Sequence, residues 1–252
     1  MNTTVVIALR EFKSLFLSPM AWTILAILQF IMAFLFLSQV ETFTLLQPKL
    51  ETIVGGPGLT DIVITPLFGN AAIILLLVTP LLTMRVICEE RRNKTLALLL
   101  SAPVSNQAII LGKYWGVLGL LIVIILLITL MPLSLLSGGD LDLGKLAANI
   151  IALLLLVMSF TAIGLFMSCI AGHPTIAAIT TFGSLLLLWI LDWTAGMDSQ
   201  YSEVFQYLSM LKHFQSIQSG LMSSVDFVYF ILFITAFIVL SVRTLDNDRL
   251  QK

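Results

Sequence analysis

Long apolar runs separated by short polar stretches dominate the chain. Six of these runs approach the ~20 residues that an α-helix needs to cross a bilayer. They predict six transmembrane helices, at about residues 20–37, 67–84, 114–136, 146–169, 175–191 and 227–242. No Pro/Ser-rich linker or internal repeat divides the chain. The prediction is therefore a single all-α integral membrane domain over residues 1–252.

The N-terminal segment, residues 3–17, carries apolar side chains at helical spacing but also Arg10, Glu11 and Lys13. It is too polar to span a membrane, so we expect an amphipathic helix in the cytoplasmic interface. Ser18-Pro19 ends it. Because no small-residue cleavage site follows the first span, that span is expected to be a retained helix and not a signal peptide.

Two longer polar segments are predicted on the outer side. Residues 38–66 are expected to form a loop with a Gly-rich centre. Residues 192–224 are expected to form an outer re-entrant or amphipathic segment, helical within residues 205–221. This segment could cap a path, bind a periplasmic partner or pack at the interface, and His213 within it is expected to be structural.

Composition supports burial in lipid, since 59% of the residues are hydrophobic and only 11% are charged. Soluble domains carry about 25% charged residues. With the N-terminus inside, three basic residues lie on outer segments, namely Lys49, Lys145 and Lys212. The inner segments hold ten, namely Arg10, Lys13, Arg85, Arg91, Arg92, Lys94, Lys113, Arg243, Arg249 and Lys252. This asymmetry predicts that both termini lie in the cytoplasm. The location we expect is the bacterial cytoplasmic (inner) membrane.

The predicted spans contain no Asp, Glu, Lys, Arg or His in their interiors, which argues against a proton- or sodium-driven carrier. ATP-binding motifs are also missing: Gly112-Lys113 is followed by Tyr114, and no glycine precedes it at Walker spacing. We therefore expect no cofactor on this chain and no nucleic-acid partner. Energy for any work must come from a partner.

An enzyme is the alternative that Glu89-Glu90 raises. Intramembrane proteases of the CAAX-processing type carry Glu-Glu-x-x-x-Arg, but Lys94 stands at the arginine position here. The predicted topology places His173 and His213 on opposite sides of the membrane, so they form no metal site or catalytic dyad. We expect no enzymatic activity of the chain itself. Glu89 and Glu90 could also be a solvated charge cluster.

The central segment, residues 85–113, holds five of the thirteen Lys and Arg residues between two apolar runs. A short apolar stretch there ends at Pro103, and Ser105 is a suitable N-cap for a helix that begins near Gln107. The segment contains Glu89-Glu90-Arg91-Arg92, Thr95-Leu96, Leu98-Leu99-Leu100-Ser101, Pro103-Val104-Ser105 and Leu111-Gly112-Lys113.

This order of residues resembles the ABC-2 type permeases, the membrane subunits of ATP-binding-cassette transporters, and among them the gliding-motility GldF-like branch. Further matches cover nearly the whole chain, at Arg10-Glu11, Ser18-Pro19, His213-Phe214, Gly220 and Val242-Arg243. There are two departures from the family pattern: Lys94 replaces a glycine and Ala97 replaces a glutamate.

The resemblance implies that residues 89–101 form a cytoplasmic coupling helix docked on a cytosolic ABC ATPase, which would bind ATP and Mg. The implied contacts are Glu89, Glu90, Arg91, Arg92, Thr95, Leu96, Leu99, Leu100, Ser101 and Pro103. The turn Gly172-His173-Pro174 is a second candidate contact. A second permease copy or a paralogue would complete the transporter as a homodimer or heterodimer.

Apolar spans favour export of a lipidic or amphipathic substrate. The main alternative is mechanotransmission, in which ATP-driven motion acts on a periplasmic partner. A passive channel is the third possibility.

Overall fold

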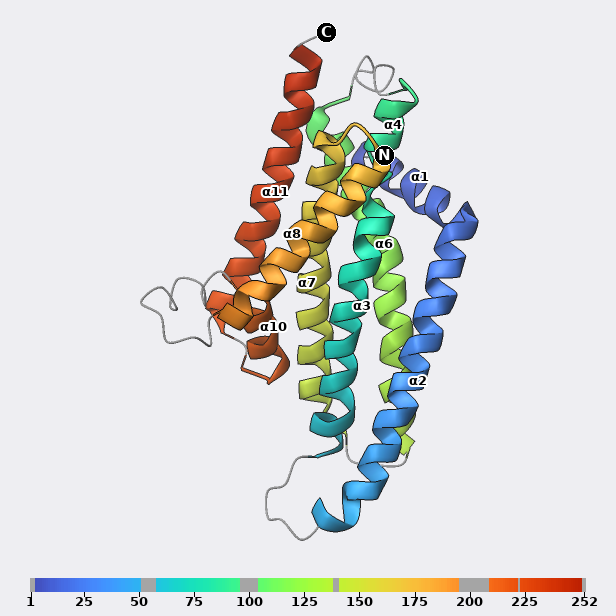
Figure 1. The fold of residues 1–252 in the computed structure, drawn as a ribbon, viewed down its shortest axis with the longest axis vertical. Helices are drawn as coiled ribbons and strands as arrows, with labels where there is room; N and C mark the ends of the chain where they lie inside the picture. The colour runs from blue at the N-terminus through green and yellow to red at the C-terminus, as the bar shows by residue number, and fades with distance from the viewer. Residues whose placement is uncertain are drawn as a thin grey trace.

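Long helices of alternating direction build the molecule (Figure 1). The computed structural model describes residues 3–50, 58–95, 104–137, 141–194, 209–221 and 223–250. The helices are α1 (Thr3–Leu17), α2 (Pro19–Leu50), α3 (Thr65–Thr83), α4 (Cys88–Arg92), α6 (Asn106–Leu133), α7 (Leu143–Ile170), α8 (Pro174–Thr194), α10 (Met210–Gln218) and α11 (Ser224–Leu250). A π-helical turn, η1 (Thr60–Ile64), precedes α3, and a 3-10 turn, η2 (Ser134–Ser137), follows α6.

Within the described residues, five stretches are long and apolar enough to cross a membrane: Pro19–Pro48, Thr60–Arg92, Asn106–Leu136, Leu143–Ile170 and Ser224–Arg249. The all-α membrane class is therefore confirmed. The remaining predicted span falls in α8, whose apolar part, Pro174–Ile190, is shorter. Six full crossings stay a prediction.

The loop predicted over residues 38–66 is wrong at both ends, because α2 continues to Leu50, and helical structure resumes at Thr60 and leads into α3 at Thr65. The polar residues there are compatible with a helix. Thr42 donates a hydrogen bond to the carbonyl of Ser38, and Thr44 donates to that of Glu41. At 1.5 Å per residue the 32 residues of α2 are about 48 Å long, well beyond the ~30 Å hydrocarbon core of a bilayer.

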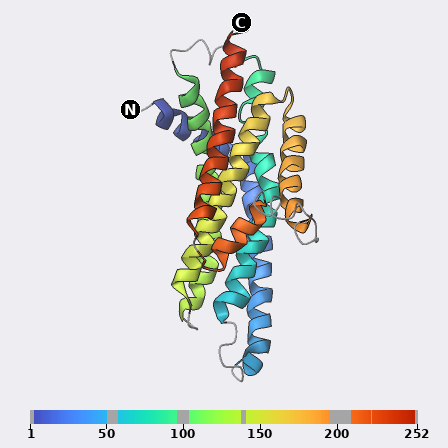
Figure 2. The same ribbon diagram turned by 90° about the vertical axis from the view of Figure 1, so that its left-hand side faces the viewer.

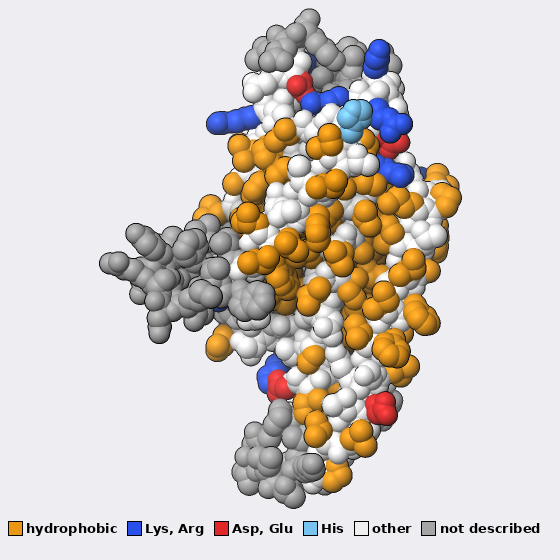
Figure 3. All heavy atoms as spheres, viewed as in Figure 1, with side chains coloured by type: hydrophobic (Ala, Val, Ile, Leu, Met, Phe, Trp, Pro, Cys, Tyr) orange, Lys and Arg blue, Asp and Glu red, His pale blue; other side chains and the backbone are white. Residues whose placement is uncertain are grey.

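Helices α3, α6 and α7 form the centre of the bundle, and most of the fully buried apolar side chains lie on them. The α3–α7 crossing is close because Gly164 faces Thr83. A Cβ atom built on Gly164 would lie 2.7 Å from Thr83 Cβ. Exposed apolar side chains gather in a broad band between the charged ends, as expected for a surface that faces lipid (Figure 3).

Helix α1 matches the predicted interfacial helix in its bounds and projects from one side of the bundle near the end where the C-terminus lies (Figure 2). It packs on α6 at three glycines. A Cβ atom on Gly112 would lie 2.7 Å from Ile7 Cβ, and one on Gly116 would lie 2.6 Å from Glu11 Cβ. One on Gly119 would meet the Phe12 ring at 2.7 Å. These glycines let the two helices approach closely.

Helix α10 lies within the region predicted to be amphipathic, whereas residues 195–208 lie outside the described part of the chain. It packs against α7, α8 and α11. His213 Nδ1 lies 2.6 Å from Asp226 Oδ1, and Ser216 donates to Asp226 Oδ2 at 2.8 Å. The His213 ring also stacks on Tyr229. The sequence prediction placed Asp226 just outside the last span, but α11 begins at Ser224, so this carboxylate is buried in its first turn.

Candidate functional site

The predicted coupling helix is only partly described. Helix α4 covers Cys88–Arg92 and then ends, so residues 89–101 do not form one continuous helix. Leu96, Leu99, Leu100, Ser101 and Pro103 lie outside the described residues, and Thr95 is the last residue before that gap. Helix α4 sits at the end of the bundle where Lys and Arg side chains gather (Figure 3).

Helix α7 holds the beginning of α4 through one hydroxyl. Ser168 Oγ accepts hydrogen bonds from the backbone N–H groups of Ile87 and Cys88, both at 3.1 Å. The same hydroxyl donates to the carbonyl of Met84 at 3.3 Å. The first N–H groups of a helix need an acceptor, and here a distant helix supplies it. Helix α4 is therefore fastened to α7 at its N-terminus.

A buried lysine on α6 fastens the inward side of α4. The Lys113 side chain is 4% exposed, and its ammonium lies 2.8 Å from Glu90 Oε1 and 3.4 Å from Glu11 Oε2. It also donates to the carbonyl of Val86 at 2.7 Å. The Lys113 ammonium thus bonds to groups of α1 and α4 and to the segment before α4, and these bonds compensate its buried charge.

The last helix provides a third attachment. Arg91 forms an ion pair and a hydrogen bond with Asp248 of α11. Two residues earlier on α11, Asp246 accepts a hydrogen bond from Asn106 Nδ2 at 2.6 Å, at the first residue of α6. Ser105 caps that helix as predicted, since its hydroxyl accepts from the N–H of Ala108. The extension of α11 beyond the apolar span thus contacts α4 and α6.

The outward side of α4 is open. Glu89 and Arg92 are exposed, whereas Glu90 and Arg91 are turned toward the bundle. A cleft of about 220 Å³ beside Glu89 is lined by charges of both signs, including Arg10, Glu11, Arg85 and Lys113. This surface offers both acidic and basic groups to a protein partner.

The structure brings the second predicted contact next to the first. Cys88 Sγ donates a hydrogen bond to the carbonyl of Ala171 at 3.3 Å, so the α7–α8 connection lies against α4. Gly172 and His173 in that connection are exposed, and Pro174 begins α8. The described part of the first predicted contact, α4, therefore lies next to the second.

A hydrogen-bonded turn ends α4. The N–H of Thr95 donates to the carbonyl of Glu90, and the N–H of Lys94 donates to that of Arg91, the pattern of a Schellman motif. That motif requires a positive φ at Lys94, which has φ of 58°. Lys94 stands at the position where the ABC-2 sequence pattern has glycine. Glycine suits this position because it adopts a positive φ without a steric clash.

No group of three or more His, Cys, Asp or Glu side chains that could hold a metal ion occurs within the described residues. The polar groups around α4 are instead arranged in pairs and hydrogen bonds that connect helices.

A family model described as "ABC-2 family transporter protein" matches residues 5–250. The chain belongs to the ABC-2 transporter family. It is thus a membrane permease subunit of an ABC transporter and not the catalytic subunit, and such permeases work with an ABC ATPase. A comparison with curated proteins found no match.

Sequence reasoning identified the acidic and basic residues of α4 in this ABC-2 permease but not their partners. Ser168, Asp248 and Glu11 lie far from α4 in the chain. Nothing in their spacing indicates which groups they meet. Sequence analysis found Lys113 within the Leu-Gly-Lys motif. Its contacts with Glu11 and Glu90 became apparent only from the structure.

Proposed function

We propose that α4 and the α7–α8 connection receive the motion of a cytosolic ABC ATPase and pass it to the bundle, driving export of a lipidic or amphipathic substrate. The observation that supports this most is the division of α4 into two sides. Its inward residues are bonded to α6, α7 and α11, while Glu89 and Arg92 remain exposed. A segment that transmits force needs an exposed side that a partner can contact and an inward side that is bonded to the other helices.

The bonds around α4 define the route of transmission in this proposal. A displacement of α4 pulls Lys113 of α6 through Glu90, and Asp248 of α11 through Arg91. It pulls α7 through Ser168. Because α6 and α7 are packed helices of 28 residues each, a shift at one end moves the whole rod.

The substrate class follows from the apolar character of the bundle. Each long helix exposes large apolar side chains. A second permease copy or paralogue would be needed to line a path with this one. The motif around Glu89 and Pro103 further leads us to place the chain in the GldF-like branch.

Mechanotransmission is the second candidate, and the length of α2 favours it. Helix α2 starts beside the interfacial α1 and is about 48 Å long, so roughly 18 Å of it would extend beyond a ~30 Å hydrocarbon core at the end opposite α4. Such an extension is a suitable attachment for a periplasmic protein.

Charge reversal tests the docking surface. We expect Glu89→Lys to lower recovery of the partner ABC ATPase at least about tenfold when the two are co-purified from detergent. A loss of about 1.4 kcal/mol corresponds to tenfold in the equilibrium constant. The matched control is Glu41→Lys, which places the same charge change at an exposed position on α2. Equal recovery of the ATPase by both variants would contradict the proposed surface.

Transmission is tested separately with Lys113→Gln, which removes the charge that joins Glu90 and Glu11. The ATPase should still co-purify, because Lys113 is buried, but stimulation of ATP hydrolysis by the permease should fall. A variant that retains full stimulation would show that the motion takes another route.

A further inference from the structure

The two sides of α1 carry opposite charge. Glu11 is turned inward to Lys113, whereas Arg10 and Lys13 are exposed. Neither Arg10 nor Lys13 forms an ion pair with a carboxylate in the described residues. The outward side of α1 therefore carries two basic side chains, of which Arg10 also borders the cleft that contains Glu89 and Glu90. This side also exposes apolar side chains such as Leu9, which is 46% exposed.

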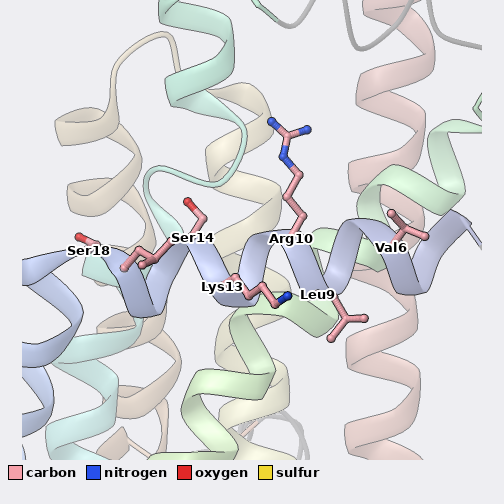
Figure 4. Close-up of a pocket in the computed structure, with 7 residues that line it drawn as sticks. Val6, Leu9, Arg10, Lys13, Ser14 and Ser18 are labelled. Atoms are coloured by element: carbon pink, nitrogen blue, oxygen red, sulfur yellow. The ribbon is translucent and has the colours of Figure 1, made fainter.

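Two hollows meet on this outward side at Leu9. The first, of about 650 Å³, is lined by Val6, Leu9, Arg10, Lys13, Ser14, Leu17 and Ser18. In Figure 4, Arg10 and Ser14 extend from one side of α1, and Leu9 extends from the other with the Lys13 ammonium nearby. The second hollow, of about 610 Å³, is mostly apolar and is lined by Thr4, Val5, Ala8, Leu9, Phe12, Trp115 and Gly119.

Two exposed tryptophans lie near the ends of this region, one beside the end of α1 and one beside the apolar hollow. Trp22 is 57% exposed and donates its indole N–H to the carbonyl of Phe16 at the end of α1, at 2.8 Å. Trp115 is 49% exposed beside the apolar hollow. Tryptophan is enriched where headgroups meet acyl chains, so these two side chains support the interfacial position predicted for α1.

The hollows keep their shape because α1 is fixed on α6. At Gly112, Gly116 and Gly119 the two helices lie so close that an added Cβ atom would overlap α1, so α1 is tightly packed on α6. Gly119 also provides the space that the Phe12 ring occupies. A ligand would therefore find the basic and apolar parts already arranged.

We propose that α1 and the start of α6 bind one anionic phospholipid of the cytoplasmic leaflet. Its phosphate would contact the Arg10 guanidinium and the Lys13 ammonium, and one acyl chain would lie along Leu9, Phe12 and Trp115. A guanidinium suits phosphate recognition because it presents several donors in one plane, and the cytoplasmic leaflet attracts basic residues. The site shares Arg10 with the cleft beside Glu89, but its test uses the purified chain without the ATPase.

Native mass spectrometry of the detergent-purified chain tests this site, with dioleoyl phosphatidylglycerol and dioleoyl phosphatidylcholine as probes. We expect a one-to-one adduct that forms preferentially with phosphatidylglycerol. The double variant Arg10→Gln/Lys13→Gln should bind phosphatidylglycerol about thirtyfold more weakly, since each basic residue near a membrane surface contributes roughly fivefold. Trp115→Ala should weaken binding of both lipids by a similar factor.

The matched control is Arg243→Gln/Arg249→Gln, which removes the same charge from exposed positions on α11 and should leave the adduct unchanged. Equal binding of both lipids by the wild-type chain would overturn the proposal without any variant. Adducts of equal strength with inorganic phosphate or glycerol 3-phosphate would show an anion site that ignores the acyl chain, and would also overturn it. A phosphatidylglycerol adduct unaffected by Arg10→Gln/Lys13→Gln would place the lipid elsewhere.

Discussion

At the scale of single residues, Lys94 carries the least favourable backbone conformation in the described chain. It is the one non-glycine residue there with positive φ. An L-residue in the left-handed region costs roughly 1–2 kcal/mol relative to glycine. The hydrogen bonds of Thr95 and Lys94 to Glu90 and Arg91 hold it in that conformation. The hydrogen bonds at the end of α4 thus outweigh the preference of lysine for a negative φ.

We predict that Lys94→Gly stabilises the protein by about 1 kcal/mol, because glycine adopts this φ without a Cβ clash. In a chain of this size such a gain raises the melting temperature by roughly 2–4 °C. The measurement is the temperature at which the monomer peak in detergent is lost.

Asn93→Gly is the control for that experiment. Asn93 has a φ of −80°, where glycine gains nothing and increases the entropy of the unfolded chain. It should leave the melting temperature unchanged or lower it. A lower melting temperature for Lys94→Gly would show that the lysine side chain makes a contribution larger than the strain.

At the scale of elements, the crossing of α3 and α7 shows why helix packing here depends on one small residue. Gly164 lies opposite Thr83, whose side chain is completely buried. The same α7 continues to Ser168, which caps α4. Close packing of α3 and α7 therefore also sets the position of the proposed coupling element.

We predict that Gly164→Ala destabilises the protein by about 1–3 kcal/mol, because the added methyl group overlaps Thr83 in a packed core. Thr83→Ala in the same chain should recover part of that loss. Thermal melting in detergent measures both. If the effects of Gly164→Ala and Thr83→Ala on the free energy of unfolding simply add in the double variant, the two residues do not interact.

Gly183→Ala provides the contrasting control, since a Cβ atom there would meet nothing within 4 Å. Alanine is a better helix former than glycine, so this variant should be stabilised by about 0.5–1 kcal/mol. Equal effects at Gly164 and Gly183 would contradict the packing argument.

At the scale of the whole molecule, both chain termini lie at one end of the bundle (Figure 1). The basic residues of α1, α4 and α11 gather at that end as well. At the opposite end, Lys145 pairs with Asp61 at 2.8 Å, so the charge of this lysine is balanced within the pair. The location of α4 in the cytoplasm stays a prediction, and it rests on the positive-inside rule.

Cysteine labelling tests that sidedness. Both native cysteines are buried, with Cys88 0% and Cys169 1% exposed, so they should remain silent. A membrane-impermeant maleimide should label Leu143→Cys in intact cells and label Asn93→Cys only after the membrane is opened. Both positions are exposed and lie at opposite ends of the bundle. The reverse pattern would overturn the orientation.

Much of the architecture could be predicted from the sequence because it depends on local patterns. Apolar runs of sufficient length give the long helices. Ser105 was recognised as a cap because an N-cap acts three residues along its own helix. The continuation of α2 beyond residue 38 was missed, because polar residues suggest a loop even where their hydroxyls bond back into the helix.

The sequence by itself determined that this chain is a helical membrane protein, which residues carry the charge of α4, and that it resembles ABC-2 permeases. These properties follow from composition, spacing and order along the chain. Only the tertiary structure decided that Lys113, Asp248 and Ser168 meet α4, and that Arg10 and Lys13 share a surface with Trp115. The physical reason is that such contacts join helices far apart in the chain, and their partners are set by how apolar faces and glycines pack.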